Sequence, residues 1–261
     1  MLKQTFLTAA LILGLSSSAN TAVITGEIRD VDFSFEGPFG AFDQFQLQRG
    51  LQVYSEVCSA CHGISQVYFR NLGDEDGLGY SEAEVKAYAA NYLIYDREID
   101  DDRDGIPSDK FPDTSIEGAP DLSLMAKARA GFSGPYGTGL NQLFKGMGGP
   151  EYIAALLTGY TGKEKEEAGQ TYFENTAFPG GWIAMPPPTI YEGEVEYADG
   201  SSNDAESVSE DVAAFLMWTA EPKLMARKRA GFTAVIFLGI LAVMLFFTNK
   251  KLWAPVKRKE V

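Results

Sequence analysis

The sequence predicts a mainly α-helical, exported domain that one C-terminal transmembrane helix holds at a membrane. Three observations support this fold class: an apolar leader at the N-terminus, an uninterrupted apolar run near the C-terminus, and helical rather than alternating spacing of the apolar residues between them. The chain has 261 residues, of which 45% are hydrophobic and 22% charged, so its length and composition suffice for a folded core.

Residues 1–22 have the three parts of a secretory signal peptide. Lys3 supplies the positive charge, residues 6–15 form the apolar centre, and small residues follow. This apolar centre is too short to cross a bilayer. The alternative to a signal peptide is an N-terminal helix buried in the folded domain. Two small-residue triplets fit a cleavage site, so we expect cleavage after Ala19 or Ala22.

Residues 231–248 contain no charged side chain, and eighteen residues are about the length needed to cross the hydrocarbon layer. Basic residues flank both ends, so the orientation is inferred from the signal peptide. Residues 23–222 are expected to form the exported domain, on the periplasmic side of the inner (plasma) membrane. Residues 223–248 would form the juxtamembrane and transmembrane helix, and residues 249–261 a basic cytoplasmic tail.

The charge is divided unevenly along the chain, which has a net charge of −14. Residues 23–230 hold 35 acidic and 16 basic side chains, whereas the last thirteen residues hold five basic side chains and one acidic one. An acidic exported body is a poor match for a polyanion, so we expect no nucleic-acid partner. It would attract a basic protein at a rate that falls as salt rises.

Apolar spacing predicts several helices joined by long loops. Capping boxes at Ser81–Glu84 and Ser207–Glu210 mark the beginnings of two of them, and Glu221-Pro222 closes the last. No alternating pattern of useful length indicates a strand. The expected helices cover residues 43–57, 81–95, 122–130, 151–157 and the segment behind Ser207, and the expected loops cover residues 98–121, 131–150 and 163–181.

The sequence Cys58-Ser59-Ala60-Cys61-His62 is a C-x-x-C-H motif, which is typical of covalent c-type haem attachment. Two thiols at this spacing at the end of a helix can bond the two vinyl groups of one haem, and the next residue then points its imidazole at the iron. Both cysteines and the single histidine of the chain fall inside this motif. We therefore expect one haem c, bound through Cys58 and Cys61, with His62 as an iron ligand.

Three other interpretations of the motif are weaker. A redox-active C-x-x-C normally follows a strand in a βαβ unit, whereas this one follows a helix. A zinc site needs a fourth ligand, and the chain has no further Cys or His. A disulfide across two residues would be strained and would leave His62 unexplained.

The second iron ligand cannot be a histidine, so a methionine thioether is the next usual choice. Met185 precedes three prolines, which stiffen the loop that would carry it. Met147, between glycines, is the second candidate, and core packing is the alternative role for Met185. One helix leads into the motif, a proline loop would supply the opposite ligand, and the final helix could cross the first helix. The predicted fold is therefore a class I cytochrome c-like haem domain enlarged by loops.

Longer stretches of the chain carry a family resemblance, including Trp182 to Pro188 (WIAMPPP) and the segment FLMWTAEPKLMARKR beginning at Phe215. With these the chain resembles the cytochrome c1 family, the haem subunits of bacterial and related cytochrome bc1 complexes. The matching residues are 49–72, 119–130, 152–160, 182–188 and 211–253. The resemblance places the family's haem-binding positions on Cys58, Cys61, His62, Met185, Arg129 and Tyr152, the last two as propionate contacts.

The resemblance implies an electron-transfer subunit, not an enzyme on its own, within a quinol:cytochrome c reductase. The expected partners are cytochrome b, a Rieske iron–sulfur protein as electron donor, and a basic cytochrome c or a membrane-anchored equivalent as acceptor. Some bacterial relatives carry a disulfide-bridged loop before the axial methionine. This chain has no cysteine to spare, so residues 163–178 must be held in another way.

Two alternatives for the function, and two for the acidic segment, stay open at this point. The chain could be a free membrane-tethered cytochrome serving a terminal oxidase, or, with an open iron, a haem peroxidase or gas sensor.

Residues 98–113 include Asp100-x-Asp102-x-Asp104-Gly105, similar to the start of a calcium loop, but Phe111 stands where the loop needs Glu. A solvated acidic loop is expected there, with partner docking or a weak cation site as alternatives.

Overall fold

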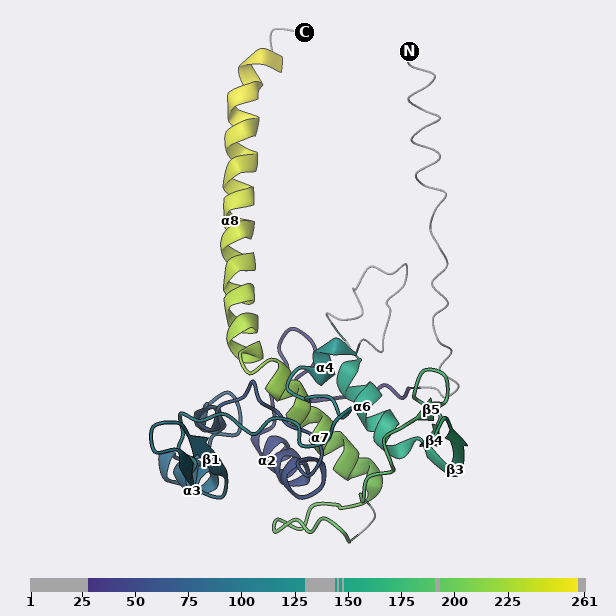
Figure 1. The fold of residues 1–261 in the computed structure, drawn as a ribbon. Helices are drawn as coiled ribbons and strands as arrows, with labels where there is room; N and C mark the ends of the chain where they lie inside the picture. The colour runs from purple at the N-terminus through teal and green to yellow at the C-terminus, as the bar shows by residue number, and fades with distance from the viewer. Residues whose placement is uncertain (1–27, 130–143, 145, 147, 191–192, 258–261) are drawn as a thin grey trace, which may run out of the picture.

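Helices α2 (Gln44–Val53) and α7 (Ala205–Ala220) cross in the body of the protein (Figure 1). The computed structural model describes residues 28–129, 144, 146, 148–190 and 193–257. A Cβ atom at Gly50 would lie 2.1 Å from the Asp211 carbonyl oxygen and 2.6 Å from the Phe215 Cβ atom, so only glycine allows this close approach. The predicted crossing of the first and last helices of the domain is confirmed.

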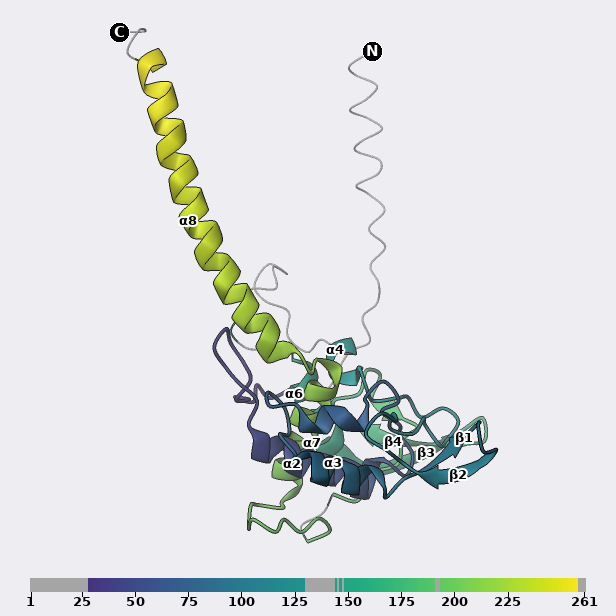
Figure 2. The same ribbon diagram turned by 90° about the vertical axis from the view of Figure 1, so that its left-hand side faces the viewer.

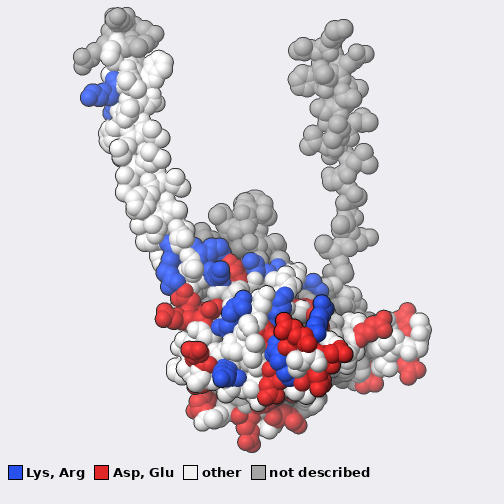
Figure 3. All heavy atoms as spheres, turned by 60° about the vertical axis from the view of Figure 1, so that its left-hand side comes forward, with Lys and Arg blue, Asp and Glu red and all other residues white. Residues whose placement is uncertain are grey.

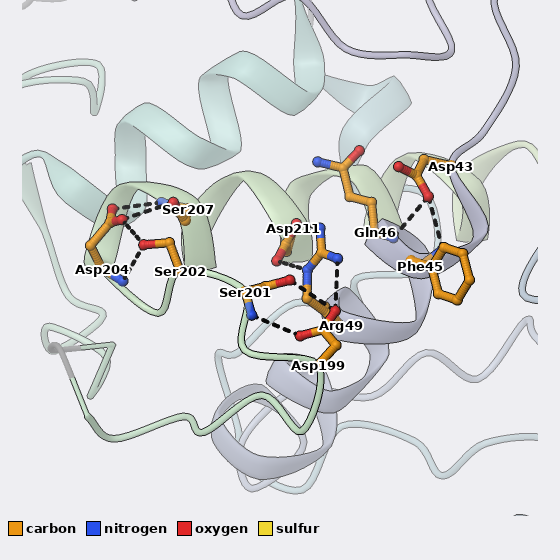
Figure 4. Close-up of polar contacts among 10 residues, drawn as sticks. All are labelled: Asp43, Phe45, Gln46, Arg49, Asp199, Ser201, Ser202, Asp204, Ser207 and Asp211. Atoms are coloured by element: carbon orange, nitrogen blue, oxygen red, sulfur yellow. Dashed lines mark hydrogen bonds and ion pairs between the residues drawn. The ribbon is translucent and has the colours of Figure 1, made fainter.

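Polar contacts fix the two crossing helices in register (Figure 4). The Arg49 guanidinium of α2 donates to both carboxylate oxygens of Asp211 in α7, at 2.7 and 3.1 Å. Asp211 is buried, and burial raises the pKa of its carboxyl group, an effect that Arg49 opposes. Asp211 is buried and Arg49 is partly exposed, so removing Arg49 would leave an uncompensated carboxylate inside the protein.

Each of the two helices begins at an aspartate. Asp43 accepts hydrogen bonds from two main-chain amides at the start of α2, and Asp204 does the same for α7 (Figure 4). The predicted helix behind Ser207 is confirmed, but the capping box was placed three residues late. Asp204 is a strong N-cap acceptor, so α7 gains a first turn in which Ser207 is helical.

The first helix ends in a π-helical turn, Tyr54–Cys58, so the helical segment reaches the C-x-x-C-H motif as predicted. The shorter helices are η2 (Phe69–Gly73), α4 (Met125–Ala128) and α6 (Gly149–Thr158). The two α-helices among these confirm the helical segments expected near residues 122–130 and 151–157. Most of the glycine-rich segment 131–150, including Met147, lies outside the described residues.

The predicted helix over residues 81–95 is only partly correct. Helix α3 (Glu82–Ala89) has the expected capping box, but the chain then forms a hairpin of β1 (Leu93–Asp96) and β2 (Asp101–Asp104). Arg103 binds Asp96 and Asp109, each with a contact of 2.7 Å, which ties the hairpin to the segment behind it. Main-chain pairing forms these strands, and the ion pairs of Arg103 add side-chain contacts that hydrophobic alternation does not indicate.

The loop expected over residues 163–181 is also wrong, because most of this segment is an antiparallel sheet. Its strands are β3 (Tyr160–Glu167), β4 (Gln170–Asn175) and β5 (Trp182–Ile183), in the order β3-β4-β5. Ala168 and Gly169, both with positive φ, form the two-residue turn between β3 and β4. Both faces of β3 are polar, so the sequence lacks the alternation that would mark a half-buried strand.

Helix α8 (Leu224–Lys257) extends away from the body (Figures 1 and 2). Among the described residues it is the one helix long and apolar enough to cross a membrane, with a mean hydropathy of 2.5 over its most apolar window, which is fully exposed. On the face shown in Figure 3, basic side chains gather where α8 meets the body, and acidic side chains predominate among the charged ones farther from α8. Helix α8 therefore has the properties of a membrane anchor.

Candidate functional site

The C-x-x-C-H motif forms a tight turn at the end of the π-helical segment. The main-chain amides of Cys61 and His62 both donate to the Cys58 carbonyl oxygen, at 3.1 and 2.9 Å. Both cysteines are free thiols. Burial raises the pKa of the Cys58 thiol to about 12, and Cys61 adds to this effect, so a thiolate ligand for a metal is disfavoured.

His62 is held at both its ring and its main chain. Its Nδ1 atom lies 2.7 Å from the Pro120 carbonyl oxygen. A carbonyl oxygen only accepts, so Nδ1 carries the hydrogen and the lone pair on Nε2 is free for a metal. The hydroxyl of Tyr54, which is buried between Phe111 and Phe215, donates to the His62 carbonyl oxygen at 3.0 Å.

The segment that supplies Pro120 also braces the chain after His62. The Leu122 amide donates to the Gly63 carbonyl oxygen at 2.8 Å. The Asp121 carboxylate accepts from the Ser65 amide and hydroxyl, at 2.8 and 2.9 Å, and from the Ser123 amide at 2.8 Å. Burial alone would raise the pKa of Asp121, but these hydrogen bonds outweigh it and hold the pKa below its usual value.

Met185 lies two residues after β5 and is half-buried. The Tyr160 hydroxyl donates to its main-chain carbonyl oxygen at 3.1 Å. The sheet that was expected to be a loop therefore leads directly into the methionine and also contacts it from its first strand. No disulfide is needed to give this segment a fixed path.

Arg129 and Tyr152, which the family resemblance singled out, are brought together by the structure. Tyr152 is 7% exposed on α6, and Arg129 follows α4 on the surface. Burial raises the pKa of the Tyr152 hydroxyl, while its hydrogen bond with Arg129 lowers it. Burial raises the pKa of the Tyr160 hydroxyl, and the nearby Tyr152 raises it further. Tyr152 therefore lies close to Tyr160, the residue that contacts Met185.

This set of side chains fits a covalently bound c-type haem. Two free thiols, an imidazole with an available Nε2 atom and a thioether are group types that bind such a haem, and an arginine–tyrosine pair can contact its propionates. In the part of the chain that the structure describes, no group of three or more His, Cys, Asp or Glu residues could hold a metal ion.

Several functional contacts were missed from the sequence. Pro120 lies in a stretch that carried the family resemblance, but nothing in its residue type indicates a partner for His62. Tyr54 could have been noted, because it lies four residues before Cys58 on the same helical face. Tyr160 also ends a stretch that carried the family resemblance, but nothing in its residue type indicates a contact with Met185, which forms across a sheet that the apolar pattern does not predict.

Comparison with known proteins shows the family to which this chain belongs. Residues 33–256 match the model of the Cytochrome C1 family. A cytochrome c1 from Cereibacter sphaeroides is 52% identical and aligns with 100% of this chain and 99% of its own length. A cytochrome c1 from Rhodobacter capsulatus is 45% identical, covering 99% of this chain and 100% of its own length.

A more distant relative from Candida albicans, a mitochondrial cytochrome b-c1 complex catalytic subunit, is 34% identical over 86% of this chain and 76% of its own length. The family match therefore extends from residue 33 through the C-x-x-C-H turn and the loop that carries Met185 into α8, and is not confined to the motif. This chain belongs to the cytochrome c1 family.

Proposed function

We propose that this chain is the haem-bearing electron-transfer subunit of a bc1 complex, a quinol:cytochrome c reductase. One haem c would be attached through Cys58 and Cys61, with His62 and Met185 as iron ligands and the Arg129–Tyr152 pair at the propionates. The observation that carries the proposal is the hydrogen bond of 2.7 Å from His62 Nδ1 to the Pro120 carbonyl oxygen, which leaves Nε2 free to bind the iron of a haem attached through the two free thiols.

The bound haem supplies a one-electron couple, and the protein determines what can reach it. A histidine and a methionine together leave no open position at the iron, so the chain would carry electrons rather than activate a substrate. The main-chain contacts around His62 hold the imidazole in one orientation. The chain on its own would then not be an enzyme, and the overall reaction would belong to the assembled complex.

The charge distribution supports a basic electron acceptor. On the face shown in Figure 3, acidic side chains predominate among the charged ones away from α8, where they would attract a basic cytochrome c or its membrane-anchored equivalent. The partners within the membrane would be cytochrome b and a Rieske iron–sulfur subunit. We infer that the rate of reduction of a basic acceptor falls steeply as ionic strength rises.

The proposed topology combines the apolar leader with α8. Residues 1–22 would be removed on export, the haem domain would lie in the periplasm, and residues 249–261 would stay in the cytoplasm. The exposed apolar surface of α8 supports a single-pass anchor in the inner membrane. Covalent haem attachment outside the cytoplasm agrees with this orientation.

The decisive experiment is a reduced-minus-oxidised visible spectrum of the chain captured from its native membranes in mild detergent. We expect b-type haem bands beside the c-type band, because cytochrome b would be captured with the chain. A c-type band alone, with the anchor intact, would contradict the proposal and favour a free tethered carrier for a terminal oxidase. Carbon monoxide binding by the reduced wild-type chain would instead favour a peroxidase or gas sensor.

A further inference from the structure

The main chain on both sides of Met185 has little capacity to hold itself. Before it, β5 is only two residues long and pairs with β4 at Trp182 and Ile183. After it, Pro186, Pro187 and Pro188 have no amide hydrogen and so donate no main-chain hydrogen bond. The hydrogen bond from Tyr160 to the Met185 carbonyl oxygen, at 3.1 Å, therefore holds the chain between a short strand and a run of prolines.

Tyr160 is itself fixed by a buried asparagine. It pairs across the sheet with Asn175, whose side chain is 0% exposed. The side-chain Nδ2 atom of Asn175 donates to the Leu156 carbonyl oxygen near the end of α6, at 2.8 Å. Its side-chain oxygen accepts from the amides of Ala177 and Phe178, at 3.0 and 3.1 Å. The end of α6 and the sheet thus form one frame, and the Tyr160 hydroxyl has a fixed position in it.

We propose that Tyr160 is the positioning residue that keeps the Met185 thioether on the haem iron, by holding the Met185 main chain through its hydroxyl. This inference rests on the proposed function, in which Met185 is the second axial ligand. Binding of the thioether to iron orders the loop that carries Met185, and this ordering costs conformational entropy. A contact that already holds the loop reduces that cost. A single hydrogen bond changes such an equilibrium by about twofold to tenfold.

The consequence is a lower reduction potential when the hydrogen bond is lost. Methionine ligation raises the potential, because it favours the reduced iron. If the loss of the hydrogen bond weakens this preference by about tenfold, the potential falls by about 59 mV for a one-electron couple. Part of the reduced protein would then also have an iron that carbon monoxide can reach.

The experiment compares three variants of the full chain in its membrane complex. Tyr160→Phe removes the hydroxyl and keeps the ring. Tyr172→Phe is the matched control, because it removes a hydroxyl from β4 that makes no hydrogen bond to Met185. Met185→Leu is the reference for complete loss of the ligand. For each variant we would measure the midpoint potential, the carbon monoxide difference spectrum and the sulfur-to-iron(III) charge-transfer band.

We expect Tyr160→Phe to lower the midpoint potential by up to about 59 mV, which corresponds to a tenfold change. The same variant should have a weaker charge-transfer band and bind carbon monoxide in part. Tyr172→Phe should behave as wild type. An unchanged potential and no carbon monoxide binding in Tyr160→Phe, with a clear effect in Met185→Leu, would overturn the inference alone. No effect in Met185→Leu would overturn the proposed ligand. Complete absence of attached haem in Tyr160→Phe, with normal attachment in Tyr172→Phe, would also count against a role limited to one ligand.

Discussion

The two sides of the candidate haem site are held in different ways. On the histidine side, the ring and the main-chain oxygen of His62 each have a hydrogen-bond partner, and the chain after it is braced by Asp121. On the methionine side, Met185 follows a two-residue strand and its main chain is held by Tyr160. The difference implies that the histidine is fixed by the folding of the core, whereas the methionine depends on a peripheral sheet.

The largest expected effect comes from breaking the histidine side with Gly63→Ala. A Cβ atom at Gly63 would lie 2.5 Å from the Pro112 carbonyl oxygen and from Asp113 main-chain atoms, which cannot move as a side chain could. We expect a loss of about 3 kcal/mol in the free energy of unfolding and little attached haem. Thermal unfolding and haem staining measure both effects.

The matched control for that variant is Gly231→Ala, because a Cβ atom there meets nothing within 4 Å. It should leave stability and haem attachment unchanged. If Gly63→Ala were equally harmless, the close packing on the histidine side would have no energetic importance.

The next largest effect tests the brace itself. Asp121→Asn removes a carboxylate that accepts three hydrogen bonds from Ser65 and Ser123, so we expect about 2 kcal/mol less stability at neutral pH. Because its pKa is lowered in the folded state, Asp121 contributes stability above its unfolded pKa and loses it as the pH falls. Unfolding followed from pH 7 to acid should therefore show a flatter acid dependence in the variant than in wild type.

A carboxyl pair at the start of α6 should respond to pH in the opposite direction. Glu36 contacts the buried Glu151 at the start of α6, and burial, followed by this contact, raises the pKa of Glu36 to about 9. Asp30 and Asp32 add to the rise, and the nearby Lys228 opposes it. A raised carboxyl pKa means that the folded state binds the proton more tightly, so stability falls as the pH rises from the unfolded value toward 9.

Glu36→Gln should therefore raise the free energy of unfolding at pH 9 by about 1 kcal/mol and flatten the alkaline dependence. Glu194→Gln, at an exposed site, is the control and should follow wild type. Identical alkaline profiles for wild type and Glu36→Gln would show that this carboxyl pair carries no charge penalty.

The smallest expected effect lies in the sheet. The Lys165 ammonium lies 4.8 Å from the centre of the Trp182 ring, and both side chains are partly exposed. Lys165→Gln should cost about 0.5 kcal/mol of stability and leave the reduction potential unchanged. A clear fall in potential in this variant would mean that the ring contact, as well as Tyr160, positions Met185.

The sequence predicted the features that depend on local pattern and missed those that depend on distant partners. The C-x-x-C-H turn, the crossing helices and the apolar span each have a signal within a few residues. Arg103 of the β1–β2 hairpin pairs with Asp109, and Asn175 of the β3–β5 sheet donates to Leu156, so both elements make contacts outside their own strands. Neither contact changes the hydrophobic pattern, so propensity alone gave a helix in one case and a loop in the other.

The most direct test of the central claim, a His62–Met185 haem, is the carbon monoxide difference spectrum of the reduced full chain with Met185→Leu. Met125→Leu is the matched control, because Met125 is a partly buried methionine packed against the core. We predict that wild type and Met125→Leu bind no carbon monoxide and that Met185→Leu binds it fully with a much lower potential. A Met185→Leu chain that stays closed to carbon monoxide, or a Met147→Leu chain that opens instead, would contradict the assignment.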